Sequence, residues 1–243
     1  MHVFADLHTH TRFSHGRGTV EDNVRAAAQR GLSQVAITDH GPASFFTVGI
    51  RNFSVLDEIR REARRCAKKY GIEVLVGLEA NVIDPWGTID VPPEVVAKLD
   101  LLLVGLHLHI VPRRFTGAVR LLFPHYWTRF TGLGRQWTRG HNTKALILAV
   151  KDNPVDIVTH PGLSLDIDTK ALAEACAQKG VALEINTSHL KSGPDFLRVA
   201  KDTGVRFAIC SDAHSPERVG DLALGVRRVQ EAGVPPWQIV NAR

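Results

Sequence analysis

The sequence predicts an α/β barrel made by one domain, and three observations lead to this prediction. The 243 residues fall within the usual range of a single α/β barrel domain and suffice to bury a sizeable core. Short apolar, β-branched runs alternate with helical segments, which is typical of a parallel sheet with crossover helices. Nearly every such run is followed by a histidine or a carboxylate, and strand ends meet at one mouth when a sheet closes into a barrel.

Each expected element has its own signal. Thr19 and Asp22 resemble a capping box, and Gly31, Gly71 and Gly180 are expected where helices end. The strands are expected at Val3–Asp6, Gln34–Thr38, Glu73–Leu78, Leu101–Leu106, Val155–Thr159, Val181–Ile185 and Val205–Ile209. The helices are expected at Val20–Arg30, from Ser54 as a cap to Tyr70, at Lys144–Val150, Asp168–Gln178 and Glu217–Glu231. No linker, repeat or low-complexity tract divides residues 1–243, so a single domain is expected.

Composition favours a globular protein with an anionic substrate. Hydrophobic residues make up 44% and charged residues 23%, which is ordinary, and the net charge of +5 is mildly basic. The cysteines Cys66, Cys176 and Cys210 are widely spaced, which indicates reduced thiols. No signal peptide is expected, and no apolar run approaches the roughly 18 residues of a membrane span. We therefore expect a cytoplasmic protein without a membrane partner.

Metal-ligating residue types follow the expected strands. His8 and His10 are two residues apart on an extended segment, so both rings face the same side, and Asp212 and His214 repeat this spacing. The other candidates are His15, His40, Glu79, His107 and His160, with Asn186 and Ser188 after the sixth strand. Imidazole and carboxylate ligands suit zinc, manganese or iron, and a carboxylate such as Glu79 can bridge two cations. The pattern predicts a hydrolase site with several metal ions.

Each candidate has an ordinary alternative. A single buried histidine more often packs or donates a hydrogen bond than binds a metal, and the argument depends on many of them at successive strand ends. His109 competes with His107 for one position, although His107 follows its strand directly. Asp39 precedes His40 and is expected to orient its imidazole, while Asp6 is expected to do the same for a neighbouring ligand or to line the barrel floor.

Seven segments together resemble the PHP (polymerase and histidinol phosphatase) family. They are Asp6-Leu-His8-Thr-His10, His15-Gly16, Ile37-Thr-Asp-His40-Gly-Pro42, Gly77-Leu-Glu79-Ala-Asn81, Thr159-His160-Pro-Gly162, Glu184-Ile-Asn186 and Ser211-Asp212-Ala-His214. The stretch from Asn142 to Gly162 is most similar to the stand-alone, YcdX-type phosphatase branch. The resemblance covers about residues 3–240 and implies a distorted (β/α)7, TIM-like barrel.

The resemblance also implies three divalent metal ions, zinc first, with manganese or iron as alternatives. It assigns His8, His10, Glu79 and Asp212 to the first metal, Glu79, His107 and His160 to the second, and His15, His40 and His214 to the third. The resulting hypothesis is hydrolysis of the phosphate monoester of a small substrate by a hydroxide that bridges two metals. The expected catalytic residues are Glu79, Asp212, His10 and His214, and the expected substrate-binding residues are Arg51, Asn186, Ser188 and Lys191.

Two other functions remain open at this point. A phosphodiesterase or exonuclease that acts on nucleic-acid ends is favoured by a basic insertion at about residues 110–140. A non-catalytic, metal-binding interaction module is disfavoured, because such a module would be expected to have lost ligands and all nine positions are filled. The oligomeric state is undetermined.

The insertion is unusual in composition. Residues 113–139 contain six arginines and six aromatic residues but no aspartate or glutamate. The arginines are Arg113, Arg114, Arg120, Arg129, Arg135 and Arg139, and the aromatic residues are Phe115, Phe123, Tyr126, Trp127, Phe130 and Trp137. The segment follows the fourth strand and should overhang the site. Its aromatic residues could pack on the barrel or a second subunit, form a substrate lid, or stack the bases of single-stranded nucleic acid.

Overall fold

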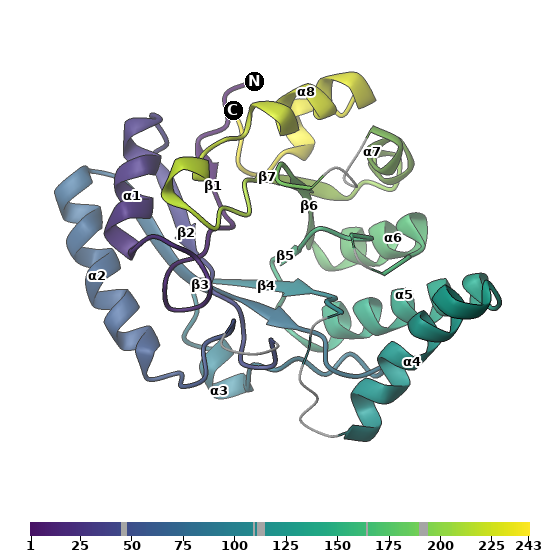
Figure 1. Ribbon diagram of the computed structural model, residues 1–243. Helices are drawn as coiled ribbons and strands as arrows, with labels where there is room; N and C mark the ends of the chain where they lie inside the picture. The colour runs from purple at the N-terminus through teal and green to yellow at the C-terminus, as the bar shows by residue number, and fades with distance from the viewer. Residues whose placement is uncertain (45–47, 109, 111–114, 164, 190–193) are drawn as a thin grey trace.

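Seven parallel strands form a nearly closed barrel with helices around it (Figure 1). The computed structural model describes residues 1–44, 48–108, 110, 115–163, 165–189 and 194–243. The strands pair in chain order: β1 (Ala5–Asp6), β2 (Gln34–Ile37), β3 (Glu73–Asn81), β4 (Leu101–Gly105), β5 (Ile157–Val158), β6 (Ala182–Asn186) and β7 (Arg206–Cys210). The predicted α/β barrel of seven strands is therefore confirmed.

The strands bury side chains on both faces. Alternate residues such as Ala36, Leu103 and Ala208 form one small cluster inside the barrel. The residues between them pack outward against the helices in a larger core. Burial on both faces explains why the strands are almost continuously apolar in sequence.

The helices that cover the barrel are α1 (Val20–Gln29), α2 (Val55–Tyr70), α3 (Pro93–Val96), α4 (Phe115–Thr131), α5 (Arg135–Asp152), α6 (Thr169–Lys179), α7 (Pro194–Lys201) and α8 (Ala223–Ala232). The capping box of Thr19 and Asp22 is present, and Gly71 and Gly180 end their helices in the left-handed conformation. Ser54 directly precedes α2 as predicted, but its side chain makes no capping bond and its backbone is already helical. Among the described residues, no helix combines the length and apolar character needed to cross a membrane.

Two boundaries differ from the predictions. Strand β3 continues to Asn81, so Glu79 lies inside a strand rather than after it. The helix predicted at Glu217–Glu231 is interrupted, with a 3₁₀ turn at Pro216–Arg218 before α8. The reason is Gly220, which has φ of +75° and donates its N–H to the buried Asp6 carboxylate at 2.7 Å.

The insertion forms α4 and the first part of α5, which together make a helical hairpin. The helix predicted at Lys144–Val150 is the last part of α5. Five of its aromatic side chains are largely exposed instead of packed on the barrel as one interpretation expected, and the side chain of Phe115 lies outside the described part. Phe123, Tyr126, Trp127, Phe130 and Trp137 are between 42% and 83% exposed. Arg113 and Arg114 lie outside the described residues.

The C-terminal segment bridges the seam between β1 and β7. Ala242 pairs with Val3 on one side, and Ile239 pairs with Phe207 on the other. The buried Asn241 side chain donates to the carbonyls of Ala5 and Ile209. The two chain ends consequently lie next to each other (Figure 1), at the amino-terminal end of the strands and away from the predicted site.

Candidate metal centre

The structure brings all nine predicted metal ligands together at the carboxyl-terminal ends of the strands. His8 and His10 follow β1 and their Nε2 atoms lie 3.0 Å apart. The Nε2 atom of His10 lies 3.2 Å from Oδ1 of Asp212, which follows β7. On the other side of the mouth, Nε2 of His107 lies 3.2 Å from Nε2 of His160. His109, the competing candidate, lies outside the described residues.

Glu79 lies between these two groups, and its side chain is fully buried. Its Oε1 atom lies 2.9 Å from Nε2 of His160 and 3.3 Å from Nε2 of His107. Its Oε2 atom lies 2.7 Å from Nδ1 of His40 and 3.4 Å from Nε2 of His8. The two oxygens of one carboxylate therefore face different sets of imidazoles, as a bridging ligand requires.

His15, His40 and His214 complete the cluster on its outer side. The ring centre of His15 lies 4.1 Å from that of His214 and 4.9 Å from that of His40. Three groups hold ligand atoms within 4.8 Å of one another, namely His8 with His10 and Glu79, His40 with Glu79 and His107, and His10 with His40 and His214. These groups overlap the implied sets but are not identical to them, because His10 and His40 each lie within reach of two groups.

Acceptors behind the ligands orient three of the rings. Nδ1 of His8 lies 2.7 Å from Oε1 of Glu184, and Nδ1 of His107 lies 2.7 Å from Oδ1 of Asn81. Nδ1 of His214 lies 2.9 Å from the main-chain oxygen of Asp212. Since these oxygens only accept, each Nδ1 carries a hydrogen and the Nε2 lone pair of the neutral ring is left for another partner.

Several ligand atoms have no hydrogen-bond partner. Nδ1 of His10, Nδ1 of His40 and Oε2 of Glu79 are buried, and none makes a hydrogen bond with any described residue. His40 and Glu79 approach to 2.7 Å without hydrogen-bond geometry. Buried polar atoms are seldom left unsatisfied in proteins. Close lone pairs and an unpaired carboxylate oxygen are what a donor set for divalent cations presents, so the residues fit bound metal ions.

The pKa values of the clustered side chains shift in different directions. Burial raises the pKa of the Glu79 carboxyl, but the imidazoles of His40 and His8 outweigh it and hold this pKa well below its ordinary value. Burial lowers the pKa of His8, but Glu184 and Glu79 outweigh it and raise this pKa well above its ordinary value. For His15, burial and the neighbouring His214 lower the pKa to about 4.

The supporting acids were not predicted as part of the site. Besides holding His8, Glu184 accepts the main-chain N–H of His160 and a side-chain N–H of Asn186. Asn81 is in turn held by Asp90, which accepts its side-chain N–H at 2.7 Å. Both Glu184 and Asn81 stand in the motifs of the resemblance, which was the only signal in the sequence that could have singled them out.

The two aspartates that were expected to orient ligand rings, Asp39 and Asp6, hold main-chain segments instead. Asp39 does not hold the His40 ring as expected: it accepts the N–H and hydroxyl of Thr11, each at 2.7 Å, and the hydroxyl of Ser14. It therefore fixes the loop that carries His10 and His15. Asp6 accepts the main-chain N–H groups of Ser211 and Gly220, and so fixes the segment around His214.

Backbone strain is located at two ligands. His160 and Asp212 are the only described residues other than glycine with positive φ, at 26° and 51°. Such conformations are uncommon for residues with a Cβ and collect at functional sites. At Gly105, an added Cβ would lie 2.5 Å from Cε1 of His107, so the glycine leaves room for that ring.

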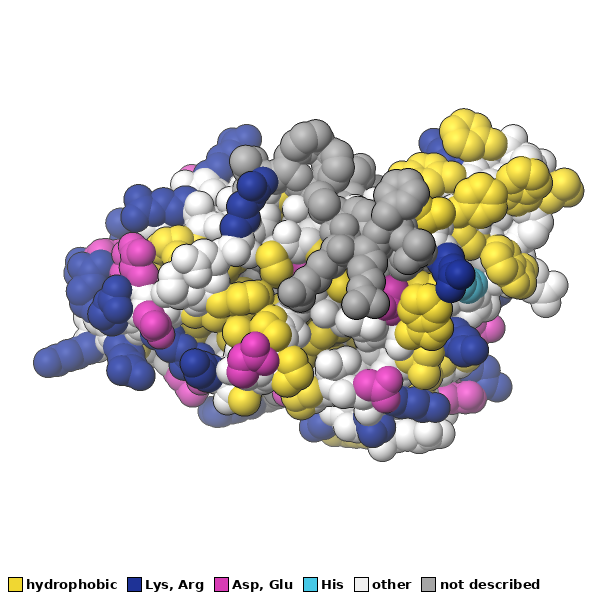
Figure 2. All heavy atoms as spheres, turned by 90° about the horizontal axis from the view of Figure 1, so that it is seen from below, with side chains coloured by type: hydrophobic (Ala, Val, Ile, Leu, Met, Phe, Trp, Pro, Cys, Tyr) yellow, Lys and Arg dark blue, Asp and Glu magenta, His cyan; other side chains and the backbone are white. Residues whose placement is uncertain are grey.

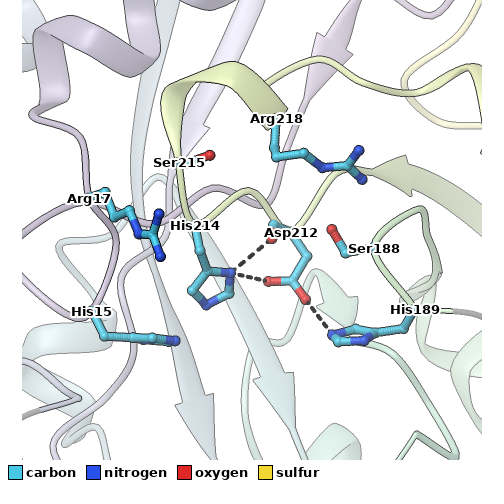
Figure 3. A pocket seen from close by; sticks show the side chains of 8 residues that line it. All are labelled: His15, Arg17, Ser188, His189, Asp212, His214, Ser215 and Arg218. Carbon is cyan, nitrogen blue, oxygen red and sulfur yellow. Dashed lines mark hydrogen bonds and ion pairs between the residues drawn. The ribbon is translucent and has the colours of Figure 1, made fainter.

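A cavity of about 410 Å³ opens beside Asp212 and His214 (Figure 3). Its lining residues are His15, Arg17, Ser188, His189, Asp212, His214, Ser215 and Arg218. Nε2 of His189 lies 3.2 Å from Oδ2 of Asp212. Arg17 and Arg218, which the sequence did not single out, bring two guanidinium groups next to the metal ligands.

The predicted substrate-binding residues are placed differently from one another. Ser188 lines the cavity, and its hydroxyl donates to the main chain of Ser211 at 2.6 Å. Asn186 is buried and donates to Asp212 and Glu184, while its oxygen accepts two main-chain N–H groups. Arg51 is exposed and does not line the cavity. Lys191 lies outside the described residues.

Comparison with known proteins agrees with this architecture. The family model of the PHP domain matches residues 6–188. This chain belongs to the PHP family. A probable phosphatase of Caldanaerobacter subterraneus subsp. tengcongensis is 32% identical over 99% of this chain and 88% of its own length. A probable phosphatase of Shewanella sp. (strain ANA-3) is 30% identical over 97% of this chain and 86% of its own.

A solved structure shares the fold of this PHP domain. It is the histidinol phosphate phosphatase of Lactococcus lactis subsp. lactis, in complex with zinc, L-histidinol and phosphate. The two chains are 16% identical, superpose with a TM-score of 0.68, and cover 95% and 94% of each other. The distorted barrel and the membership of a family of metal-dependent phosphoesterases, both predicted from the sequence, are thus confirmed.

Glu184→Gln tests the role of the acceptors. The amide places an N–H group against either His8 Nδ1 or the His160 N–H, so at least one orienting contact becomes repulsive. We expect zinc affinity to fall about 10- to 100-fold, measured by competition with a chromophoric chelator. Glu174→Gln, on the exposed face of α6, is the matched control and should bind zinc as the wild type does. Unchanged affinity in Glu184→Gln would show that Glu184 does not orient the ligands.

Proton release tests the raised pKa values. A histidine whose pKa lies well above its ordinary value keeps its proton at pH 7, and a metal must displace that proton to bind. Since the pKa of His8 is raised well above its ordinary value, zinc binding should release about one proton per chain from this ring at pH 7, and fewer as the pH rises. Calorimetric titration of apo-protein in buffers of different ionisation enthalpy measures this number. Glu184→Gln should release fewer protons, because Glu184 contributes most to the rise at His8; equal release would contradict this assignment.

Proposed function

We propose that this PHP domain hydrolyses phosphate monoesters at a centre of three divalent metal ions. The observation that carries the proposal is the buried Glu79 carboxylate, whose two oxygens face separate groups of imidazoles. The unpaired atoms of His10 and His40 support it, because they lack any other partner among the described residues. The zinc, histidinol and phosphate bound to the Lactococcus protein support zinc as the metal and a small phosphorylated compound as the substrate.

The proposed ligand sets are those that the family resemblance implies, and the distances between their members are compatible with them. His8, His10, Glu79 and Asp212 would hold one ion; Glu79, His107 and His160 a second; His15, His40 and His214 a third. When bound, the ions supply a water nucleophile of lowered pKa and neutralise the charge on the phosphoryl oxygens. Phosphoryl transfer needs mainly positioning and charge neutralisation, which this chain provides by holding the ligands rigidly.

The cavity residues would bind and orient the substrate. Arg17 has no acidic partner within ion-pair distance in the described part of the chain, and guanidinium groups bind phosphate oxygens bidentately. Arg218 is paired with Asp221 and would add charge at the same mouth. His189 is held on Asp212 and faces the cavity, so it could pass a proton to the leaving oxygen.

Glu79→Ala tests the centre itself. The substitution removes the shared ligand of two ions, so metal content should fall from about three ions per chain to about one, and monoester turnover should fall below detection. Plasma mass spectrometry and phosphate release from a panel of monoesters measure the two quantities. Circular dichroism and urea unfolding confirm that the variant folds. Near-normal turnover in Glu79→Ala would overturn the proposed function.

Arg17→Gln tests the phosphate contact. Loss of one charge-assisted hydrogen bond to substrate should lower kcat/KM about 10- to 100-fold, mainly through a higher KM, with metal content unchanged. Arg12→Gln is the matched control, since Arg12 is an exposed arginine of the same loop that does not line the cavity. Equal kinetics in both variants would remove Arg17 from the substrate site.

A further inference from the structure

A second groove lies outside the metal centre, between the segment after β3 and the α4–α5 hairpin. Its volume is about 410 Å³, and it is lined by Pro85, Trp86, Arg120, Phe123, Pro124, Trp137, His141 and Lys144. Figure 2 shows hydrophobic side chains gathered at one end of the molecule, over α4 and α5, with basic side chains among them. Nothing in the proposed chemistry uses this surface.

The groove presents aromatic faces to solvent. Trp86, Phe123 and Trp137 are 55%, 57% and 63% exposed. Burying an aromatic side chain stabilises a folded domain, so three exposed rings around one groove indicate a surface that is covered by a partner. Tyr126, Trp127 and Phe130 extend the exposed aromatic surface along α4.

The groove also carries positive charge without compensation. The guanidinium of Arg120 lies 5.7 Å from the ring centre of Trp86, and Lys144 lines the same groove. No acidic side chain of the described residues pairs with Arg120, Lys144 or Arg129, and none occurs in the sequence from 113 to 139. The partner is therefore anionic as well as rich in apolar or planar groups.

This charge pattern decides between partners. A symmetric dimer through this groove would place Arg120 and Lys144 against the same cations of the second copy, and the lining of the groove contains no acidic group to meet them. A lipid surface would contact the outer rings but leave the groove between Trp86 and Trp137 unfilled. Single-stranded nucleic acid offers planar bases for the rings and phosphates for the cations, which matches both features.

The groove shares its end of the barrel with the metal centre. Trp86 stands in the segment that follows β3, the strand that contains Glu79. Helix α4 comes after β4, the strand that His107 follows. Both walls of the groove thus rise from the carboxyl-terminal ends of strands that position metal ligands.

We infer that this groove binds single-stranded nucleic acid, with bases stacked on Trp86, Phe123 and Trp137 and phosphates near Arg120 and Lys144. The inference rests on the proposed function in one respect: the phosphate monoester that reaches the metals would be carried at the end of such a strand, which the sequence left open as the alternative to a small compound. The binding itself is independent of turnover, and the two can fail separately.

The test measures binding by fluorescence anisotropy of the metal-loaded protein with a labelled oligothymidylate of about 12 nucleotides, made with phosphorothioate linkages to resist cleavage. Trp137→Ala and Phe123→Ala should each weaken binding about tenfold. Arg120→Gln should reduce the slope of log K against log salt by about 0.7, the value for one phosphate contact of a single strand.

Matched controls share the chemistry but not the location. Trp237→Ala removes a tryptophan that is 71% exposed near the amino-terminal end of β7, and Arg64→Gln removes an exposed arginine of α2. Both should bind as the wild type does. Turnover of p-nitrophenyl phosphate should be unchanged in Trp137→Ala, which separates loss of the groove from loss of the metal centre.

Several results would overturn the inference. They are no oligonucleotide binding at low salt, equal losses in Trp237→Ala, binding to phosphatidylglycerol vesicles alone, or a dimer that Trp137→Ala dissociates without any oligonucleotide binding. Monoester turnover without oligonucleotide binding would support the proposed function and contradict nucleic-acid binding by this groove. Oligonucleotide binding without turnover of any phosphoester would support binding by the groove and contradict the proposed function.

Discussion

The burial of one carboxylate, that of Glu79, among five imidazoles is the interaction on which the rest of the site depends. An ionised carboxylate without solvent is costly unless charges or hydrogen bonds compensate it. Here His40 and His8 hold the pKa of the Glu79 carboxyl low, and His107 and His160 contact its Oε1 atom. The geometry is stable because Glu79 belongs to β3, paired with Leu103 on one side and bonded to the chain around His40 on the other. A ligand in a strand is held more rigidly than one on a loop.

The remaining ligands lie on loops, and two of them are held in strained backbone conformations. A residue in a sparsely populated backbone region costs about 1–3 kcal/mol, and both His160 and Asp212 are of this kind. Hydrogen bonds offset the cost locally: Glu184 accepts the N–H of His160, and Asn186 donates to Asp212 at 3.0 Å. Glu184 therefore stabilises one strained residue and orients the ring of His8 at the same time, which connects β6 to both groups of ligands.

The sequence predicted the barrel and the assembly of the ligands because both follow from short-range patterns. Strand ends are visible as apolar runs, and a parallel barrel brings those ends together whatever the loops do. The partners of the ligands follow no such pattern: Glu184 and His8 are 176 positions apart, and a glutamate in an apolar strand has no local signal for its role. Arg17 and Arg218 were not predicted as site residues for the same reason, since only the folded loops bring them to one cavity. The α4–α5 hairpin was not predicted because Pro124 lies inside α4 and because exposed aromatic residues break the alternation of apolar and polar faces expected of a surface helix.

Positive charge is distributed in this molecule in a way that suits a metal-dependent reaction. Burial lowers the pKa values of His10, His107 and His214, so these rings are neutral at pH 7 and their lone pairs are free for cations. The permanent charges belong to arginines, which keep their protons at any physiological pH and lie at the rim of the mouth, as Arg17 and Arg218 do. An anionic substrate is thus attracted to the mouth independently of pH. The charge that acts on the phosphoryl group itself would come from metals, and the neutral rings of His10, His107 and His214 would hold them without a competing proton.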